Sequence, residues 1–231
     1  MVESRVPDPE SQVPFPARGV IFDMDGVLVD SGPAHYESWR LMARRHGLDI
    51  DEARFKATFG RTSTEIIQIL WPGLPAAEVQ RRDAEKEAVY RDLIRGRVPL
   101  MPGCVETLAA LRAAGRRIAI GTSGPPENIE LVLSEGGLAS YFEAVVHRGM
   151  IARGKPAPDC FLLAAERLGL PPAACVVIED APAGVQAGCA AGMTVIALAS
   201  NYPPAQLQTA GATHVVSHLT DVPPLVIDYA G

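Results

Sequence analysis

From residue 98 onward, short apolar runs alternate with stretches that carry apolar residues at helical spacing. An earlier apolar run, "RGVIF", has the same strand character. Strands are predicted at 18–23, 117–123, 142–147, 174–180, 194–200 and 213–217, with helices at 104–115, 127–137, 159–170 and 183–192. Short apolar strands joined by amphipathic helices are typical of a parallel sheet covered on both faces. We therefore predict an α/β fold with a Rossmann-like parallel sheet core.

A polar, helix-rich stretch interrupts this alternation after the first strand. The apolar residues of "AHYESWRLMARRHGL" recur at helical spacing, and two further helices, 63–70 and 76–94, are separated by the break "WPGLP". The N-terminus is rich in proline and polar residues. The expected organisation is a flexible tail at 1–17, a core domain at 18–32 and 98–231, and an inserted helical domain at 33–97.

Composition and charge argue against several classes of function. The chain of 231 residues has a formal net charge of -6, which disfavours non-specific binding to nucleic acid or anionic lipid. No window supplies the roughly 18 apolar residues of a membrane span, and the N-terminus lacks the apolar segment of a signal peptide. The four cysteines form no C-x-x-C pair, so neither a zinc site nor a disulfide framework is expected. We expect a cytoplasmic protein without nucleic-acid or membrane partners; nothing in the sequence indicates an oligomeric state.

Chemically distinctive residues lie at the ends of four predicted strands or in the loops after them. They are Asp23 and Asp25, Thr122 and Ser123, Lys155, and Glu179 with Asp180. Ligands of parallel α/β sheets bind at the carboxyl ends of the strands. These residues are therefore expected to converge on one edge of the sheet, although the chain separates them widely.

The residue types at that edge suit a hard divalent cation and a phosphoryl group. Carboxylates such as Asp23, Glu179 and Asp180 supply the oxygen ligands that Mg²⁺ prefers. Lys155 adds a positive charge, and the hydroxyl groups after the second strand can bind phosphate oxygens. Of the pair Asp23 and Asp25, one carboxylate can attack phosphorus while the other protonates the leaving group and then activates water.

Each feature also has a purely structural interpretation when it is taken alone. Asp25 and Gly26 can form a turn, and Asp180 can cap a following helix. A calcium-loop interpretation of "DMDG" fails, because Ile21 stands where an oxygen ligand is needed and Gly32 where the loop requires glutamate. The presence of all four features in order at four strand ends favours a functional site.

Two residues of the helical stretch also have structural interpretations. His35 on a polar helix is typical of a surface or capping histidine. Arg61 can simply precede a helix N-cap at Thr62 or Ser63, with Glu65 or a neighbour completing a partial capping box.

Taken together, four segments resemble the motifs of one superfamily. "FDMDGVLVDS", "IAIGTS", "GKPAPD" and "VIEDAPAGV" are similar, in this order, to the four motifs of the haloacid dehalogenase superfamily. The resemblance is specifically to its phosphatases with a helical cap inserted after the first strand. It runs from about Arg18 to the C-terminus and implies that residues 33–97 form the cap.

The resemblance also implies a role for each motif residue. Asp23 would be the nucleophile and Asp25 the general acid/base. The implied phosphate-binding residues are Thr122, Ser123 and Lys155. The implied Mg²⁺ ligands are Asp23, Glu179 and Asp180, together with the backbone carbonyl of Asp25.

Residue differences distinguish the branches of the superfamily. Dehalogenases and phosphonatases lack the second aspartate, so Asp25 argues against both. Asp30, Ser31 and His35 match a stretch shared by β-phosphoglucomutase-type enzymes and by many sugar-phosphate phosphatases. Arg61 lies about two positions earlier than the arginine of the mutase pattern, which favours hydrolysis. His35 and Arg61 are therefore candidate substrate-side residues.

The expected function is Mg²⁺-dependent hydrolysis of a small phosphomonoester through an aspartyl phosphate. A sugar phosphate or a phosphoglycolate-like ester fits this expectation, although the sequence does not name the substrate. A β-phosphoglucomutase-like sugar phosphomutase is the alternative. A non-catalytic binding or regulatory module is a more remote one, because such a module has no need of every catalytic side chain and here none is missing.

Overall fold

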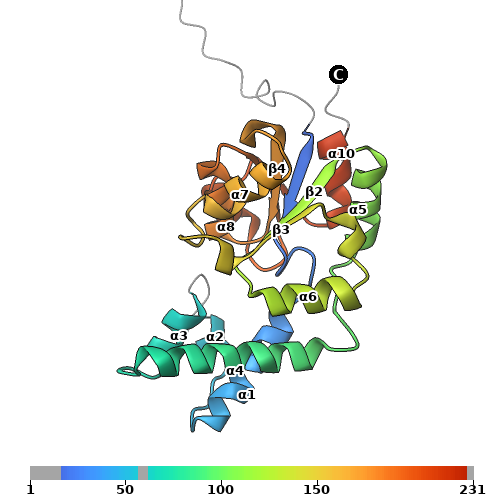
Figure 1. Ribbon diagram of the computed structural model, residues 1–231. Coiled ribbons are helices and arrows are strands. Elements are labelled where there is room, and N and C mark those ends of the chain that lie inside the picture. The colour runs from blue at the N-terminus through green and yellow to red at the C-terminus, as the bar shows by residue number, and fades with distance from the viewer. Residues whose placement is uncertain (1–16, 57–61, 228–231) are drawn as a thin grey trace, which may run out of the picture.

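A six-stranded parallel β-sheet forms the centre of the protein (Figure 1). The computed structural model describes residues 17–56 and 62–227. The strands are β1 (Gly19–Phe22), β2 (Arg117–Gly121), β3 (Ala144–Val146), β4 (Cys175–Glu179), β5 (Thr194–Leu198) and β6 (His214–Val216). Their order in the sheet is β3-β2-β1-β4-β5-β6, and every neighbouring pair is parallel. The predicted α/β class with a parallel core is confirmed.

Helices cover both faces of the sheet. Consecutive residues of each strand face opposite sides, so apolar strands present apolar side chains on both faces. In β1, Val20 and Phe22 belong to one buried apolar cluster and Ile21 to another. The first cluster is completed by α5 (Cys104–Ala113), α6 (Pro126–Glu135) and α10 (Val222–Ile227), and the second by α7 (Asp159–Arg167), α8 (Pro182–Ala190) and α9 (Pro204–Thr209). Short 3₁₀ helices lie at Ala139–Tyr141, Arg148–Met150, Pro172–Ala174 and Leu219–Asp221.

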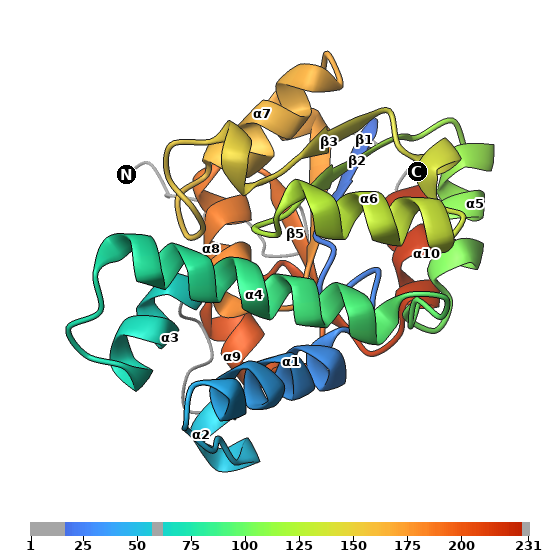
Figure 2. The same cartoon turned by 60° about the horizontal axis from the view of Figure 1, so that its bottom comes forward.

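A group of helices lies beyond the carboxyl edge of the sheet (Figures 1 and 2). These helices are α1 (Gly32–Arg45), α2 (Glu52–Lys56), α3 (Ser63–Leu70) and α4 (Ala76–Ile94), and we call them the helical segment. Both α3 and α4 begin and end where the sequence predicts. The predicted N-cap at Thr62 is confirmed, since its side chain accepts the Glu65 backbone N–H and Glu65 completes the capping box.

The helical segment has an apolar core of its own. Trp39 and Met42 of α1 pack with Ile67 of α3 and Val79 of α4. A core separate from the two clusters of the sheet is what an inserted domain requires. Within the described ranges, no helix combines the length and apolarity needed to cross a membrane.

Two adjacent chain segments join the helical segment to the sheet. Val29 and Leu100 form an isolated antiparallel bridge. The backbone N–H of Asp30 donates to Pro99 at 2.8 Å, and that of Met101 donates to Leu28 at 2.9 Å. The outgoing and returning segments are therefore hydrogen-bonded to each other, and they lie a few residues from Asp25.

The register of the central strands brings their carboxyl ends to the same level. Phe22, the last residue of β1, pairs with Ile120 of β2 and with Ile178 of β4. The next residue, Asp23, donates its backbone N–H to Ile178 at 2.9 Å. The predicted convergence of the residues after β1, β2 and β4 therefore follows directly from the pairing of these three strands.

The tight packing between α5 and the sheet predicts a large effect of truncating one buried leucine. Leu108 is fully buried in the first cluster, so Leu108→Ala should lower the free energy of unfolding by about 2–5 kcal/mol. Val105, in the same helix, is 41% exposed, and Val105→Ala should change it by no more than about 0.5 kcal/mol. Urea denaturation measures both values. Equal effects of the two substitutions would contradict the assigned packing of α5.

Candidate active site

Lys155 connects the ends of two neighbouring strands. Its Nζ donates to Oδ1 of Asp23 at 2.7 Å and to Oε1 of Glu179 at 2.6 Å. The lysine comes from the loop between β3 and α7, and its ammonium group lies 4.7 Å from the centre of the Phe161 ring. Burial alone would lower the pKa of Lys155, but the charges of Asp23 and Glu179 raise it above its usual value. Lys155 is therefore a buried, permanently charged partner of the two acids.

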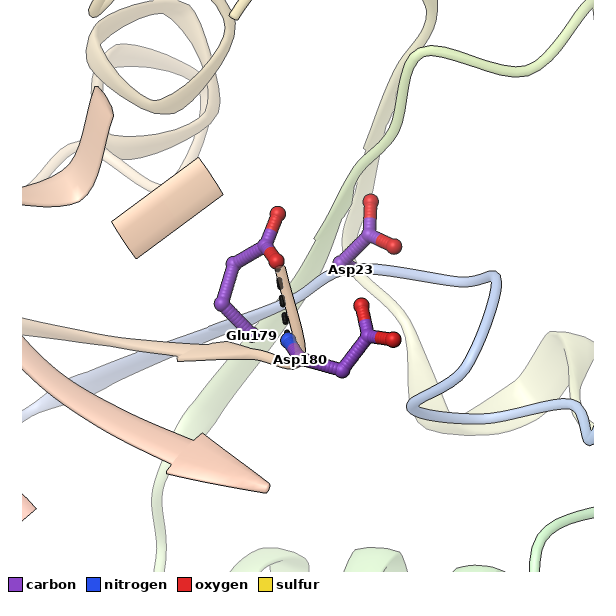
Figure 3. A group of neighbouring side chains, drawn as sticks. All are labelled: Asp23, Glu179 and Asp180. Carbon is purple, nitrogen blue, oxygen red and sulfur yellow. Dashed lines mark hydrogen bonds between the residues drawn. The ribbon is translucent and has the colours of Figure 1, made fainter. Parts of the chain in front are cut away.

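Asp23, Glu179 and Asp180 form a compact acidic cluster at the ends of β1 and β4 (Figure 3). All three residues are buried, and each offers an oxygen within 4.8 Å of the others. Oε2 of Glu179 accepts the backbone N–H groups of Asp180 and Ala181 at 2.8 and 2.9 Å. These hydrogen bonds orient the Glu179 carboxylate at the turn that leads into α8.

Two glycines permit this close assembly. Gly26 has a φ of 76°, and a Cβ atom there would collide with the carboxylate of Asp180. A Cβ atom at Gly184 would overlap the carboxylate of Glu179. The predicted turn at Asp25 and Gly26 is thus present and also allows the loop after β1 to approach Asp180.

The acidic cluster fits a hard divalent cation. Burial raises the pKa of Asp23 to about 7, against the opposing charge of Lys155. Burial and the neighbouring charges of Glu179 and Asp23 raise the pKa of Asp180 well above its usual value. Three buried carboxylates facing one lysine leave an excess of negative charge, and their oxygens are the donor type that Mg²⁺ prefers.

Asp25 has a different environment from Asp23. Its Oδ1 lies 3.2 Å from Nε2 of His35, and the Tyr90 hydroxyl donates to the same oxygen at 3.5 Å. The His35 ring stacks on the Tyr90 ring with 4.1 Å between centroids. Burial alone would raise the pKa of Asp25, but the hydrogen bond and charge of His35 lower it below its usual value. The two carboxylates of "DMD" therefore have pKa values shifted in opposite directions.

The remaining predicted residues lie at different depths around these carboxylates. Thr122 is buried, and its hydroxyl accepts the backbone N–H of Gly124 at 3.0 Å. Ser123 lines the cleft between the sheet and the helical segment. His35 lies in this cleft beside Asp25. Arg61 is outside the described residues.

The cleft has a volume of about 1220 Å³. Its walls include Asp25 and Lys155 from the sheet side and aromatic residues of the helical segment, such as Tyr36 and Trp39. Polar residues that complete the lining include Asp83, Lys86, Glu87, Asn128, Arg148 and Asn201. The cavity is large enough for a small organic molecule.

Sequence reasoning missed several polar residues of this site. Asn201 donates to Oδ2 of Asp180 at 2.8 Å, and Ser200 donates to the Gly26 carbonyl at 2.7 Å. Both residues follow β5, so the rule that placed the other strand ends could have found them. Lys86 and Glu87 are adjacent charges within a polar helix, and that sequence pattern does not indicate burial.

Comparison with known proteins identifies the family. Residues 17–192 match the family model of the haloacid dehalogenase-like hydrolases. The chain belongs to this family. The hydrolase is 36% identical over 173 residues to fructose-1-phosphate phosphatase YqaB of Escherichia coli, covering 73% of this chain and 89% of that protein.

Further similarities extend over most of the hydrolase. Beta-phosphoglucomutase of Bacillus subtilis is 32% identical over 206 residues, covering 84% of this chain and 86% of its own length. The crystal structure of a HAD hydrolase of family IA, variant 3, from Entamoeba histolytica superposes with a TM-score of 0.82 at 27% identity. This superposition covers 88% of the hydrolase and 94% of that chain.

Metal binding at the acidic cluster predicts a measurable stabilisation. At a Mg²⁺ concentration about 100 times the Kd, the free energy of unfolding should rise by about 2.7 kcal/mol. Asp180→Asn removes one charged ligand, so most of this increase should disappear. Asp92→Asn, at an exposed position of α4, should retain it. Thermal denaturation with Mg²⁺ and with chelator measures the difference, and an undiminished increase in Asp180→Asn would exclude Asp180 as a ligand.

The raised pKa of Asp23 predicts how the stability of the metal-free protein depends on pH. Because this pKa rises from 3.8 to about 7 on folding, folding favours the protonated acid. That contribution is fully present below about pH 4 and is lost as the pH rises through about 7. The Asp23→Asn side chain remains neutral throughout.

In chelator, Asp23→Asn should therefore be more stable than the wild type at about pH 8, and the difference should shrink toward about pH 5. Urea denaturation at several pH values measures it. Asp92→Asn is the matched control for the loss of one carboxylate. A difference between Asp23→Asn and wild type that stays constant with pH would contradict the raised pKa.

Proposed function

We propose that this hydrolase is a Mg²⁺-dependent phosphatase of a small sugar or polyol phosphate. The observation that carries the proposal is the position of Asp23, whose carboxylate is bound by Lys155 at the edge of the cleft while Asp25 follows on the same turn. The similarity to fructose-1-phosphate phosphatase YqaB supports a phosphorylated carbohydrate as the substrate.

In the proposed reaction, Asp23 attacks the phosphorus atom and forms an aspartyl phosphate. Lys155, already bound to Asp23, offsets negative charge on the transferred phosphoryl group. Thr122 and Ser123, at the end of β2, donate hydrogen bonds to its oxygens. Residues Asp23, Glu179 and Asp180, with the backbone carbonyl of Asp25, would hold Mg²⁺. When bound, the ion would supply further positive charge for the phosphoryl oxygens.

Asp25 is proposed to act as general acid and then as general base. It gives a proton to the departing alcohol. It later takes a proton from the water that hydrolyses the aspartyl phosphate formed on Asp23. The hydrogen bond and charge of His35 lower the pKa of Asp25, which keeps its carboxylate ionised and therefore able to accept a proton in the second step. The charge of the substrate phosphate, brought close to Asp25, favours its protonated form in the first step.

We propose that the helical segment is the cap of the enzyme, with residues 33–97 as the cap domain and 18–32 and 98–231 as the core. Its separate apolar core and its two hydrogen-bonded connections to the sheet support this division. Tyr36 and Trp39 provide apolar surface in the cleft, and Gln80 provides an amide. Such a lining suits a polyol, which has both hydroxyl groups and C–H faces.

A sugar phosphomutase is the second candidate. The contact between His35 and Asp25 is compatible with it and equally with a phosphatase, because the stretch that contains this histidine resembles both branches. The similarity to the Bacillus subtilis enzyme over 84% of the chain supports it. A mutase transfers the phosphoryl group between two positions of a sugar, so it releases little inorganic phosphate.

Phosphate release from a panel of sugar phosphates, polyol phosphates and phosphoglycolate tests the proposal. The wild type should release phosphate from at least one ester with Mg²⁺ and none with chelator. Asp23→Asn should reduce turnover by more than about 10³-fold, because the nucleophile is lost. Asp92→Asn should retain wild-type turnover.

The outcomes separate the candidate functions. Interconversion of sugar-phosphate isomers without phosphate release would show that the protein is a mutase and not a phosphatase. Substantial turnover by Asp23→Asn would exclude Asp23 as the nucleophile. If the wild type neither released phosphate from any ester nor interconverted sugar-phosphate isomers, a binding role for the same cleft would remain.

A further inference from the structure

A chain of buried polar contacts leads away from Asp25 and crosses the helical segment. Its members, in order of contact, are Asp25, His35, Lys86, Glu87, Asn128 and Arg91. Lys86, Glu87 and Asn128 are 2%, 6% and 1% exposed. Burying three polar side chains of this size is costly unless each has partners. The proposed reaction uses none of the three directly.

The contact of Lys86 with His35 determines which ring nitrogen of His35 carries the proton. Nζ of Lys86 lies 2.8 Å from Nδ1 of His35 and donates to Oε1 of Glu87 at 3.0 Å. An ammonium group has donors only, so Nδ1 of His35 accepts. In a neutral imidazole the proton then resides on Nε2, the nitrogen that lies 3.2 Å from Asp25. His35 therefore donates to Asp25 as long as Lys86 stays charged.

Glu87 supplies the countercharge of Lys86, and a residue outside the helical segment holds Glu87 in place. Asn128 of α6 donates from Nδ2 to Oε2 of Glu87 at 2.7 Å. Arg91 donates to Oδ1 of Asn128 at 2.9 Å. This second bond fixes the orientation of the Asn128 amide, with its oxygen toward Arg91 and its nitrogen toward Glu87. The helices α4 and α6 lie side by side at this contact (Figure 2).

We propose that Glu87 and Asn128 are positioning residues that fix the tautomer of His35 when α4 docks on α6. Asn128 aligns Glu87, and Glu87 in turn keeps the charged Lys86 against His35. Asp25 then receives a hydrogen bond from His35 only in the docked arrangement. The catalytic consequence rests on the proposed phosphatase function, whereas the tautomer of His35 does not.

A second contact between the same two parts provides a matched control. Asp83, one turn before Glu87 in α4, forms an ion pair with Arg148 at 3.0 Å. Arg148 belongs to the sheet side, in the 3₁₀ helix after β3. This pair also joins the helical segment to the sheet, but it contains no member of the chain that leads to His35. Asp83→Asn therefore removes one ion pair between the two parts, while the hydrogen bond between Glu87 and Asn128 and the contacts of Lys86 stay in place.

Nitrogen NMR of protein labelled with ¹⁵N-histidine reads the tautomer directly. The chain contains five histidines, and the His35→Gln variant identifies the signal of His35. At a pH at which the nitrogen shifts show a neutral His35 ring, the wild type should show a protonated Nε2 and an unprotonated Nδ1. Lys86→Met removes the donor to Nδ1, so the His35 signal should change to a mixture of tautomers.

Glu87→Gln removes the countercharge, and Asn128→Asp removes the N–H that aligns Glu87. Both should move the His35 signal in the direction of Lys86→Met, and Asp83→Asn should not. In a Lys86→Met background, Glu87→Gln should cause no further change. If Glu87→Gln fails to fold, the spectra of Asn128→Asp and of the wild type still test the proposed tautomer of His35.

With the substrate found by the phosphate-release panel, Glu87→Gln and Asn128→Asp should lower kcat by about 10- to 100-fold and leave KM within about twofold. A protonated Nδ1 in the wild type would overturn the proposal. It would also be overturned if the His35 signal were unchanged in Asn128→Asp, or changed equally in Asp83→Asn. Because the spectra need no substrate, inactivity toward every ester would refute the proposed function alone.

Discussion

The site depends on one buried ammonium group, that of Lys155, which lies between carboxylates from adjacent strands. Removing charge from water is costly, and a buried ion pair recovers that cost only with good geometry. The parallel register of β1 and β4 supplies this geometry, because it delivers Asp23 and Glu179 at the same level. A third carboxylate, Asp180, remains in excess. A fold optimised for stability alone would have no reason to collect these charges, and their excess of negative charge supports the proposed cation site.

Much of this site could be predicted from the sequence because it depends on one general property of parallel sheets. Residues that follow apolar strands come together at the carboxyl edge, so Asp23 and Asp180 could be placed near each other without knowledge of side-chain packing. Residues after β5 obey the same rule, but Ser200 and Asn201 carry no charge and did not stand out. Elements of five or six residues, such as α2, α9 and α10, are too short to show a helical period.

The other side of the cleft could not be predicted in the same way. Lys86 and Glu87 lie in a helix rich in charged residues, where the usual interpretation is a solvated surface. Their burial results from the packing of α4 against α1 and α6, which are distant in sequence. The resemblance names His35 as a candidate substrate-side residue, but its contact with Asp25, and which of its nitrogens carries the proton there, depend on the packing of Lys86. Long-range packing therefore determines the surroundings of Asp25, while local pattern is sufficient to place Asp23, Glu179 and Asp180 at one edge of the sheet.

The two hydrogen-bonded connections between the sheet and the helical segment have a geometric consequence for substrate size. They lie next to Asp25, and α4, with 19 residues, extends about 28 Å from α3 to the returning connection. Any rotation about these connections displaces a group in proportion to its distance from them. His35, four residues from Ser31, would move little in such a rotation, and α3, at the other end of α4, would move further. The rotation would let the cleft accept leaving groups of different length in the proposed reaction, while the surroundings of Asp25 keep nearly constant dimensions.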